Sequence, residues 1–358
     1  MHDASRLQRP IEVEVAPGPV PVRVLSWDPV CERSVCIARR LGVEFEVIHY
    51  FGYRRPSLAA IKYPLQLRKT LALLRGEGPL TVFISNPPPF AALAVYLAGL
   101  RRPGLRYVMD VHTGPFLEPK WRPFIPLTRF LARRSLATVV TNEALAERVR
   151  GWGAPAFVLR NPLSQIPQGR PWGRPEAAEK FVVTAICSFY EDEPIDELLR
   201  VADLPADVHV YVTGDSRKMR HGLRRALSPQ VTLTGFVSND DFAALLRRSD
   251  AVVCLCRRPH TLLQGAVEAA AVGAALVTSE SVAMREVFTR GTVYVENHAT
   301  SIEAGIRQAR ARSTQLRAEM RQLASAMRAD WEAEFRKLWA VMVAERAIVP
   351  PLTKNRGA

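Results

Sequence analysis

The chain has 358 residues, of which 48% are hydrophobic and 23% charged, and its formal net charge is +14. This composition is ordinary for a globular protein and does not favour disorder, and the length is enough for two domains with separate cores. The five cysteines lack paired zinc-type spacing, which argues against a disulfide scaffold or a structural metal site and favours a reducing cytoplasm. No apolar run approaches the roughly 20 residues of a membrane-spanning helix. Neither a spanning segment nor an export signal is therefore expected.

The first half alternates short apolar, β-branched runs with amphipathic stretches, which is typical of βαβ units in a parallel sheet. Pro64 is expected to break or kink the second helix of this half. The predicted strands are Val22–Trp27, Val43–Tyr50, Leu80–Ser85, Tyr107–Val111 and Leu136–Thr141, and the predicted helices are Cys31–Leu41, Ser57–Arg75, Phe90–Leu100, Leu127–Arg134 and Glu143–Gly151.

A Pro/Gly-rich segment, Asn161–Pro175, cannot propagate helix or strand and is the expected hinge. The alternation then restarts. The second set of predicted strands is Phe181–Cys187, Val208–Thr213, Val231–Leu233, Ala251–Cys256, Ala275–Thr278 and Thr292–Val295, with helices over 194–202, 217–227, 239–248, 262–272 and 300–312.

The pattern predicts an α/β protein with two Rossmann-like, doubly wound domains, residues 1–163 and 164–330, facing across a cleft. Ligands in such folds bind outside the carboxyl ends of the strands. The stretch Gln315–Glu345 reads as a long helix with Trp331 and Phe335 on one apolar face. Residues 331–358 are expected to carry this helix back onto the first domain and to end in a tail.

Two blocks in the second half resemble the donor-binding domain of GT-B glycosyltransferases. One is the turn Gly235-Phe236-Val237, and the other is Glu268-Ala269-Ala270-Ala271-Val272-Gly273 at a predicted helix start. The resemblance implies a GT-B fold and a retaining glycosyltransferase-4-like enzyme that takes a sugar from a nucleotide diphosphate donor.

Shorter blocks look like one branch, the β-mannosyltransferase that adds the first mannose to chitobiosyl-diphosphodolichol, with its bacterial relatives. This resemblance suggests GDP-mannose as donor, with a UDP-sugar close behind, and a lipid-linked or polysaccharide acceptor. Many retaining enzymes hold the diphosphate with an Arg and a Lys after the first strand of the donor domain, and this sequence has Phe189 and Glu193 near those positions. Those enzymes also have two glutamates eight positions apart, where this sequence has His260 and Glu268. The anomeric outcome of the transfer therefore stays open. The blocks are Asp28 with Arg33-Ser34, Phe51-Gly52-Tyr53, Ser85-Asn86-Pro87-Pro88-Pro89, Asp110-Val111-His112, Val140-Thr141-Asn142, and Ser188 to Glu193 with Leu198-Leu199.

Glu268 is the main donor-binding candidate, because a carboxylate there can accept both ribose hydroxyls of a nucleotide. The alternative is an acid that only stabilises the start of a helix. The segment Pro259–Leu263, with His260, Thr261, Leu262 and Leu263, would offer backbone N–H groups to the diphosphate.

The other donor-binding candidates follow predicted strands. Gly214 permits a tight turn close to a ligand, and Lys218 or Arg217 beyond it would face the diphosphate. Arg257 and Arg258 could supply cations or be solvated surface charge. Ser188 belongs to the acidic loop named above, and Val237 to a turn whose backbone would frame the nucleobase.

In the first half, His112 ends a predicted strand, where an imidazole could bind a sugar hydroxyl, act as a base or polarise a leaving group. A buried histidine with a structural hydrogen bond is the plain alternative. Asp110 shares its face of the strand and would orient His112 or serve as the base. Asp28 and Arg33, on the first β–α loop, are the acceptor-binding candidates, and ordinary helix surface is the alternative for Arg33.

No Asp-x-Asp pair or His/Cys cluster stands at these strand ends, so no metal or other cofactor is expected. Residues 1–165 carry 23 Lys/Arg against 12 Asp/Glu, hence +11, and residues 166–358 carry only +3. A basic first half suits an anionic membrane surface, and the basic and apolar residues interleaved over Tyr53–Arg75 suit either an interfacial helix or an ordinary surface helix. We expect a peripheral protein at the inner membrane face that binds no nucleic acid, since no recognition motif is present. A catalytically inert nucleotide-sugar-binding partner is the alternative.

Overall fold

The computed structural model describes residues 20–29, 31–51, 56–173, 179–219, 227–259 and 261–345. The chain forms two compact units. The first unit comprises Met1–Pro162 and Asp330–Ala358, and the second comprises Leu163–Ala329. The chain therefore passes between the units after Pro162 and again after Ala329, and part of the expected hinge, residues 174–175, lies outside the described residues.

The first unit is built on a six-stranded parallel sheet in the order β2-β1-β3-β4-β5-β6. The order reverses direction between β1 and β3, so this point is the topological switch of the sheet. Its strands are β1 (Val22–Ser26), β2 (Phe45–Val47), β3 (Leu80–Asn86), β4 (Leu105–Val111), β5 (Ala137–Val140) and β6 (Ala156–Val158), and its helices are α1 (Glu32–Leu41), α2 (Ala59–Leu73), α3 (Pro89–Gly99), α4 (Gly114–Leu117), α5 (Ile125–Ala132) and α6 (Glu143–Arg150), with 3-10 turns η2 (Pro56–Leu58) and η3 (Pro119–Phe124).

Alternating side chains of these strands bury opposite faces of the sheet, as the two-residue period requires. Leu25 and Ile84 pack on the face covered by α2, α3, α5 and α6. Val24 and Phe83 pack on the other face against α1. Both faces are apolar, which explains the continuous hydrophobic runs of the strands.

The second unit repeats the plan with a parallel sheet in the order β12-β11-β10-β7-β8-β9. Its topological switch lies between β7 and β10. Helices α7 and α11 cover one face, and α8, α9 and α10 cover the other. The elements are β7 (Phe181–Ala185), β8 (Val208–Thr213), β9 (Val231–Gly235), β10 (Ala251–Cys254), β11 (Ala275–Ser279), β12 (Thr292–Val295), α7 (Ile195–Leu199), α8 (Asn239–Arg248), α9 (Gln264–Val272), α10 (Val282–Val287), α11 (Ala299–Ala311) and the 3-10 turn η5 (Ser216–Lys218).

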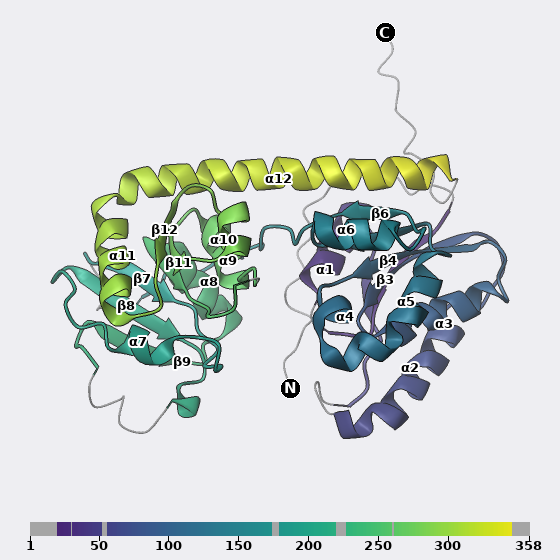
Figure 1. The fold of residues 1–358 in the computed structure, drawn as a ribbon, viewed down its shortest axis with the longest axis horizontal. Coiled ribbons are helices and arrows are strands. Elements are labelled where there is room, and N and C mark those ends of the chain that lie inside the picture. The colour runs from purple at the N-terminus through teal and green to yellow at the C-terminus, as the bar shows by residue number, and fades with distance from the viewer. Residues whose placement is uncertain are drawn as a thin grey trace, which may run out of the picture. The chain divides into compact units, whose positions relative to one another are not determined.

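The last helix, α12 (Ser313–Ala344), belongs to both units and is the long yellow helix of Figure 1. Its first part contributes Met320 and Leu323 to the core of the second unit. Its last part contributes Trp331, Phe335 and other apolar side chains to the core of the first, where they stack on one another and against the α1 side of the sheet.

The predicted α/β architecture with two parallel sheets is confirmed, and some local expectations differ. Helix α2 runs through Pro64 without a break. Strand β6 and helices α4 and α10 were not predicted. Most of the expected helix 217–227 falls outside the described residues. No helix among the described residues has the length and apolarity to span a membrane.

Candidate functional site

The first group of predicted site residues meets at the carboxyl edge of the first sheet. His112 follows β4 directly, and its backbone N–H donates to the carbonyl of Asn86 at the end of β3, at 2.9 Å. Asp110 pairs in register with Ser85 of β3, so both side chains lie on the face covered by α1. The site therefore stands beside the switch point between β1 and β3.

Arg33 and Asp110 form a buried ion pair, with the Arg33 side chain 0% and the Asp110 side chain 1% exposed. Nε of Arg33 donates to Asp110 Oδ1 at 2.6 Å, and its other nitrogens donate to the carbonyls of Leu159 at 2.8 Å and Val111 at 3.2 Å. All three nitrogens of the guanidinium therefore donate hydrogen bonds within the first unit. This corrects the expectation that Arg33 presents its charge to an acceptor: it anchors the carboxylate from within.

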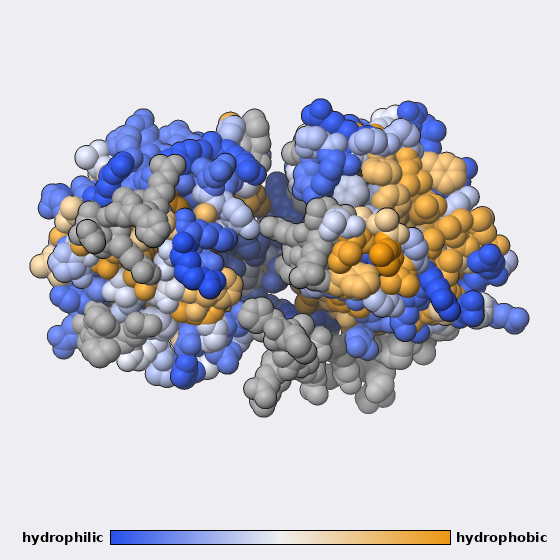
Figure 2. Space-filling view, turned by 90° about the horizontal axis from the view of Figure 1, so that it is seen from below, coloured by the Kyte–Doolittle hydropathy of each residue, from blue (hydrophilic) through white to orange (hydrophobic). Residues whose placement is uncertain are grey.

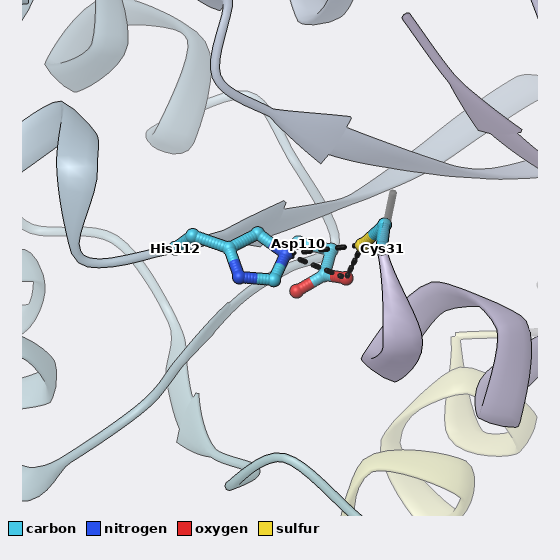
Figure 3. Close-up of side chains that lie close together, drawn as sticks. All are labelled: Cys31, Asp110 and His112. Atoms are coloured by element: carbon cyan, nitrogen blue, oxygen red, sulfur yellow. Dashed lines mark hydrogen bonds and ion pairs between the residues drawn. The ribbon is translucent and has the colours of Figure 1, made fainter. Parts of the chain in front are cut away.

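A chain of hydrogen bonds joins His112 to Asp110 through Cys31 and Ser34. Figure 3 shows how closely Cys31, Asp110 and His112 lie together. Ser34 Oγ donates to Asp110 Oδ2 at 2.8 Å, Cys31 Sγ donates to Ser34 Oγ at 2.9 Å, and Cys31 Sγ lies 3.1 Å from His112 Nε2. Because the S–H bond is directed at Ser34, the sulfur is left to accept from Nε2–H. This favours the tautomer with a lone pair on Nδ1, which points away from Cys31 and Asp110.

Burial and charge set the protonation of this cluster. Burial alone would raise the pKa of Asp110, but Arg33 outweighs it, with help from His112 and the hydrogen bonds of Arg33 and Ser34, and the pKa is lowered. Burial and then the charge of Arg33 lower the pKa of His112, against the opposing effect of Asp110 and Asp28. The imidazole is therefore neutral at pH 7. Burial raises the pKa of the Cys31 thiol to about 11, so the thiol stays protonated.

Sequence reasoning missed the roles of Cys31 and Ser34, and the burial of Asn86. Asn86 ends β3 at the carboxyl edge, whereas Cys31 and Ser34 lie at the start of α1, which follows β1. Ser34 and Asn86 belong to the blocks that resemble the β-mannosyltransferase branch, but no pattern marked Cys31. The side-chain amide of Asn86 is fully buried, and neither of its polar atoms has a hydrogen-bond partner in the part of the chain that the structure describes. Asp28 lies on the loop after β1, where its backbone N–H and carbonyl bond to the Ser26 hydroxyl at 2.9 and 2.7 Å.

The expectation that no His/Cys cluster stands at these strand ends was wrong: Cys31, Asp110 and His112 form a group that could hold a metal ion, since one ligand atom of each lies within 4.8 Å of the others. The donor set is poor for that purpose. Asp110 already binds Arg33 and Ser34, and the Cys31 thiol would have to lose a proton that burial holds firmly. Metal independence nevertheless stays a prediction.

The second group of predicted site residues follows the carboxyl ends of β7, β8, β9 and β10 in the second sheet. Gly214 shows why a glycine is needed there. Its φ is +105°, and a Cβ on it would collide with the carbonyl oxygen of Cys187 after β7. The turns after β7 and β8 therefore pack together more closely than any other residue would allow.

The loop after β7 closes on its own carboxylate. Glu193 accepts backbone N–H groups from Ser188, at 3.0 and 2.9 Å to its two oxygens, and from Phe189 at 2.8 Å. Phe189 has φ +58°, and this left-handed residue turns successive N–H groups toward one point. Burial raises the pKa of Glu193, although the hydrogen bonds from Ser188, Phe189 and Tyr190 lower it.

The predicted cations gather around the same loop. Lys218 Nζ lies 3.5 Å from the Ser188 carbonyl and 4.7 Å from the Tyr190 ring centroid. Arg257 donates through Nη1 to the Glu193 carbonyl at 2.8 Å, and Arg258 pairs with Asp192 at 3.1 Å. Arg217 turns away instead and forks onto Asp215, at 2.7 and 3.0 Å.

The remaining donor-binding candidates surround α9 and the turn after β9. Helix α9 begins at Gln264, so Glu268 is its fifth residue and lies one turn after the helix start, while Thr261, Leu262 and Leu263 precede the helix. Val237 is half-buried beside Phe236, which is 78% exposed. His260 lies outside the described residues.

Two family models match the chain, one for each unit. A glycosyl transferase 4-like domain matches residues 8–162, and a glycosyl transferases group 1 domain matches residues 180–315. Together these models span most of the sequence, and each unit that they match is built on a parallel α/β sheet. The chain belongs to the GT-B glycosyltransferases.

Solved structures with the same fold are distant in sequence. HepE from Anabaena, in complex with UDP, is 15% identical, with a TM-score of 0.61 over 91% of this chain and 100% of that one. Sucrose-phosphate synthase from Thermosynechococcus elongatus is 13% identical, with a TM-score of 0.63 over 90% and 99%. An α,α-trehalose-phosphate synthase (UDP-forming) from Burkholderia vietnamiensis is 13% identical, with a TM-score of 0.56 over 88% and 100%. No curated protein sequence matches the chain.

The two sheet edges of this GT-B glycosyltransferase hold different chemistry. The edge in the first unit offers a neutral imidazole supported by a buried ion pair. The edge in the second unit offers cations and backbone N–H groups. The first arrangement suits removal of a proton, and the second suits an anion.

Proposed function

We propose that this glycosyltransferase moves a hexose from a GDP- or UDP-linked donor, bound by the second unit, to a hydroxyl of an acceptor bound by the first. Mannose is the sugar that the sequence blocks favour, and a lipid-linked or polysaccharide chain is the acceptor. The UDP bound to HepE supports a nucleotide donor. Glu268 would accept the ribose hydroxyls, and Lys218 and Arg257 would attract the diphosphate.

The observation that carries the proposal is the neutral His112 at a strand end, linked through Cys31 and Ser34 to the buried Arg33–Asp110 pair. We assign it the role of base. Its Nδ1 takes the proton of the acceptor hydroxyl as that oxygen bonds to the anomeric carbon of the sugar. The bond from that carbon to the phosphate oxygen breaks, and the nucleoside diphosphate leaves with the electron pair. Asp110 keeps its charge and stabilises the imidazolium.

His112→Ala tests the role directly. We expect kcat to fall roughly 100-fold to 10,000-fold, the range of a general base, while the Kd for nucleoside diphosphate is unchanged. His298→Ala is a matched control, because His298 is an exposed histidine that caps α11 in the second unit. Sugar transfer from radiolabelled GDP-mannose and UDP-sugars would be measured. A His112→Ala protein with full turnover would exclude this assignment.

We also propose a peripheral location at an anionic membrane. A groove of about 330 Å³ lies between the C-terminal halves of α2 and α3, with apolar residues such as Leu67 and Leu71 inside it. Arg68, Arg75 and Arg101 line it, and the structure gives them no carboxylate partner within its described residues.

Exposed apolar side chains accompany the arginines. Ile61 and Leu65, one turn apart on α2, are 55% and 36% exposed, and Leu100 after α3 is 64% exposed. On the face drawn in Figure 2, hydrophobic surface gathers on the first unit, next to hydrophilic side chains. This mixture fits the headgroup region of an acidic leaflet.

Vesicle binding tests the location. The charge reversal Arg68→Glu/Arg75→Glu/Arg101→Glu should weaken binding to vesicles with 30% phosphatidylglycerol at least about 100-fold, since the loss of each basic residue near such a leaflet alone removes about a factor of five. The control is Arg290→Glu/Arg321→Glu/Arg328→Glu, the same charge change on exposed residues of the second unit. An equal loss of vesicle binding in the two variants would mean that only the net charge of the protein matters, and it would contradict the assignment of this surface to the membrane.

The inert nucleotide-sugar-binding partner remains the second candidate, because the carboxylate of Glu193 occupies backbone donors that a donor phosphate could use. Isothermal titration with UDP and GDP, followed by turnover assays, separates the two functions. Binding without transfer or hydrolysis would favour the partner.

A further inference from the structure

The loop Ser188–Glu193 contains an anion seat that is already filled. Two backbone N–H groups, of Ser188 and Phe189, donate to the Glu193 carboxylate at 2.8–3.0 Å, and that of Tyr190 also stabilises its charge. Converging N–H groups of this kind bind phosphate in other folds as readily as carboxylate. Because the donors belong to the main chain, no sequence motif reveals them.

The seat lies where a parallel sheet binds ligands. The loop follows β7, and the chain after β10 is tied to it by the Arg257 N–H, which donates to the Asp192 carbonyl at 2.7 Å. Strands β7 and β10 flank the switch point of the second sheet. The close packing of Gly214 on Cys187 holds the turn after β8 against the same loop.

Positive charge converges on the seat from two directions. The ammonium of Lys218 stands 3.5 Å from the Ser188 carbonyl, and Arg257 reaches the Glu193 carbonyl from the other side. The charged form of Glu193 is disfavoured in this position, because the loss of solvation outweighs the hydrogen bonds and raises the pKa of the carboxyl group. A diphosphate carries more negative charge than the Glu193 carboxylate, so the same N–H donors and cations would bind it more strongly.

We propose that the N–H groups of Ser188, Phe189 and Tyr190 form a seat for the phosphate chain of the donor, and that the Glu193 carboxylate is its internal competitor. The side chain leaves the seat when a nucleoside diphosphate enters and returns when it departs. This inference rests on the donor site of the proposed function. It makes Glu193 a residue that sets donor affinity, not a catalytic residue.

Isothermal titration of the full chain with UDP, GDP and inorganic pyrophosphate tests it. Glu193→Ala should bind all three at least tenfold more tightly, because the competitor is gone. Glu191→Ala is the matched control: it removes the same charge from the same loop at an exposed residue, and its affinities should stay within about twofold of the parent. Uridine, which has no phosphate, should bind both variants and the parent alike.

A purely structural Glu193 predicts the opposite result. If the side chain only closes the loop, Glu193→Ala should melt at a lower temperature and bind UDP equally or more weakly. Glu193→Gln keeps an acceptor oxygen for the loop while it removes the charge, so under the proposal it folds like the parent and binds pyrophosphate more tightly. Unchanged or weaker pyrophosphate binding by a folded Glu193→Gln protein overturns the inference. Loss of transfer in His112→Ala does not affect it, because binding alone is measured.

Discussion

Cys31 Sγ lies 3.1 Å from His112 Nε2 while its own S–H donates to Ser34 Oγ at 2.9 Å, so one neutral thiol links the histidine to the buried carboxylate network. Cys31→Ala should lower kcat about tenfold and leave donor Kd unchanged, because His112 loses the acceptor that fixes its tautomer. Cys31→Ser should restore most of the rate. Steady-state kinetics check both variants. Cys36→Ala, which replaces another cysteine on α1, is the control and should leave kcat unchanged. Full activity of Cys31→Ala would show that the contact between Cys31 and His112 does not contribute to the rate.

The Arg33–Asp110 pair should dominate the stability of the first unit. Arg33→Met leaves a buried, uncompensated carboxylate, and we expect a loss of about 3–5 kcal/mol in the free energy of unfolding. The half-exposed pair Arg40–Glu332, at 3.2 Å, is the comparison, and Glu332→Gln should cost less than about 1 kcal/mol. Urea unfolding measures both. Similar losses in the two variants would contradict the importance of burial.

The lowered pKa of His112 predicts where activity fails in acid. The base works only when neutral, so the acid limb of kcat/KM should have an apparent pKa below 6.5. Folding stability should fall over the same range. Below pH 6.5 the unfolded histidine binds more protons than the folded one. Below about pH 4 the unfolded aspartate also binds protons while folded Asp110, whose pKa is lowered, keeps its charge, so stability falls further. Circular dichroism melts from pH 7.5 to 4 and rate profiles check the two effects; an acid limb above pH 6.5 would contradict them.

Gly214→Ala should damage the second unit more than Gly235→Ala. Both glycines have positive φ, +105° and +68°, but only at Gly214 does an added Cβ meet other atoms, whereas at Gly235 nothing lies within 4 Å. We expect a loss of about 1 kcal/mol for Gly235→Ala and about 3 kcal/mol for Gly214→Ala. UDP titration should show weaker binding only for Gly214→Ala. Equal effects would mean that backbone strain alone matters there.

Chelation should leave transfer unaffected. The three residues that could hold a metal already satisfy one another through Ser34 and Arg33. Dialysis against EDTA, followed by assays with and without Zn²⁺ or Mg²⁺, checks this. A rate that falls with EDTA and returns with one ion would overturn metal independence.

The sheets were predictable because buried parallel strands and amphipathic helices have different periods. Strand β6 was missed because its three residues, Ala156–Val158, carry too little pattern, and α10 because six residues give less than two turns. Helix α2 shows that packing can override a proline, since the tertiary contacts of its neighbours keep the helix whole around Pro64.

The site was predictable in position but not in role. Strand ends located His112, Asp110 and Lys218, because carboxyl edges follow from topology. Arg33 looked like an exposed cation, and its burial depends on Asp110, 77 residues away. Glu193 looked like a departure from a motif, and its partners are main-chain donors common to every residue type.

Helix α12 makes the first unit discontinuous in sequence. Its fold uses Trp331, Phe335, Leu338 and Met342, which are synthesised only after the whole second unit has been made. A fragment ending near residue 162 should therefore expose an uncovered apolar sheet face and aggregate. The first unit can complete its folding only late in translation. A deletion of the last thirty residues should therefore destabilise the sheet that residues 22–158 form, although those residues lie far away in the sequence.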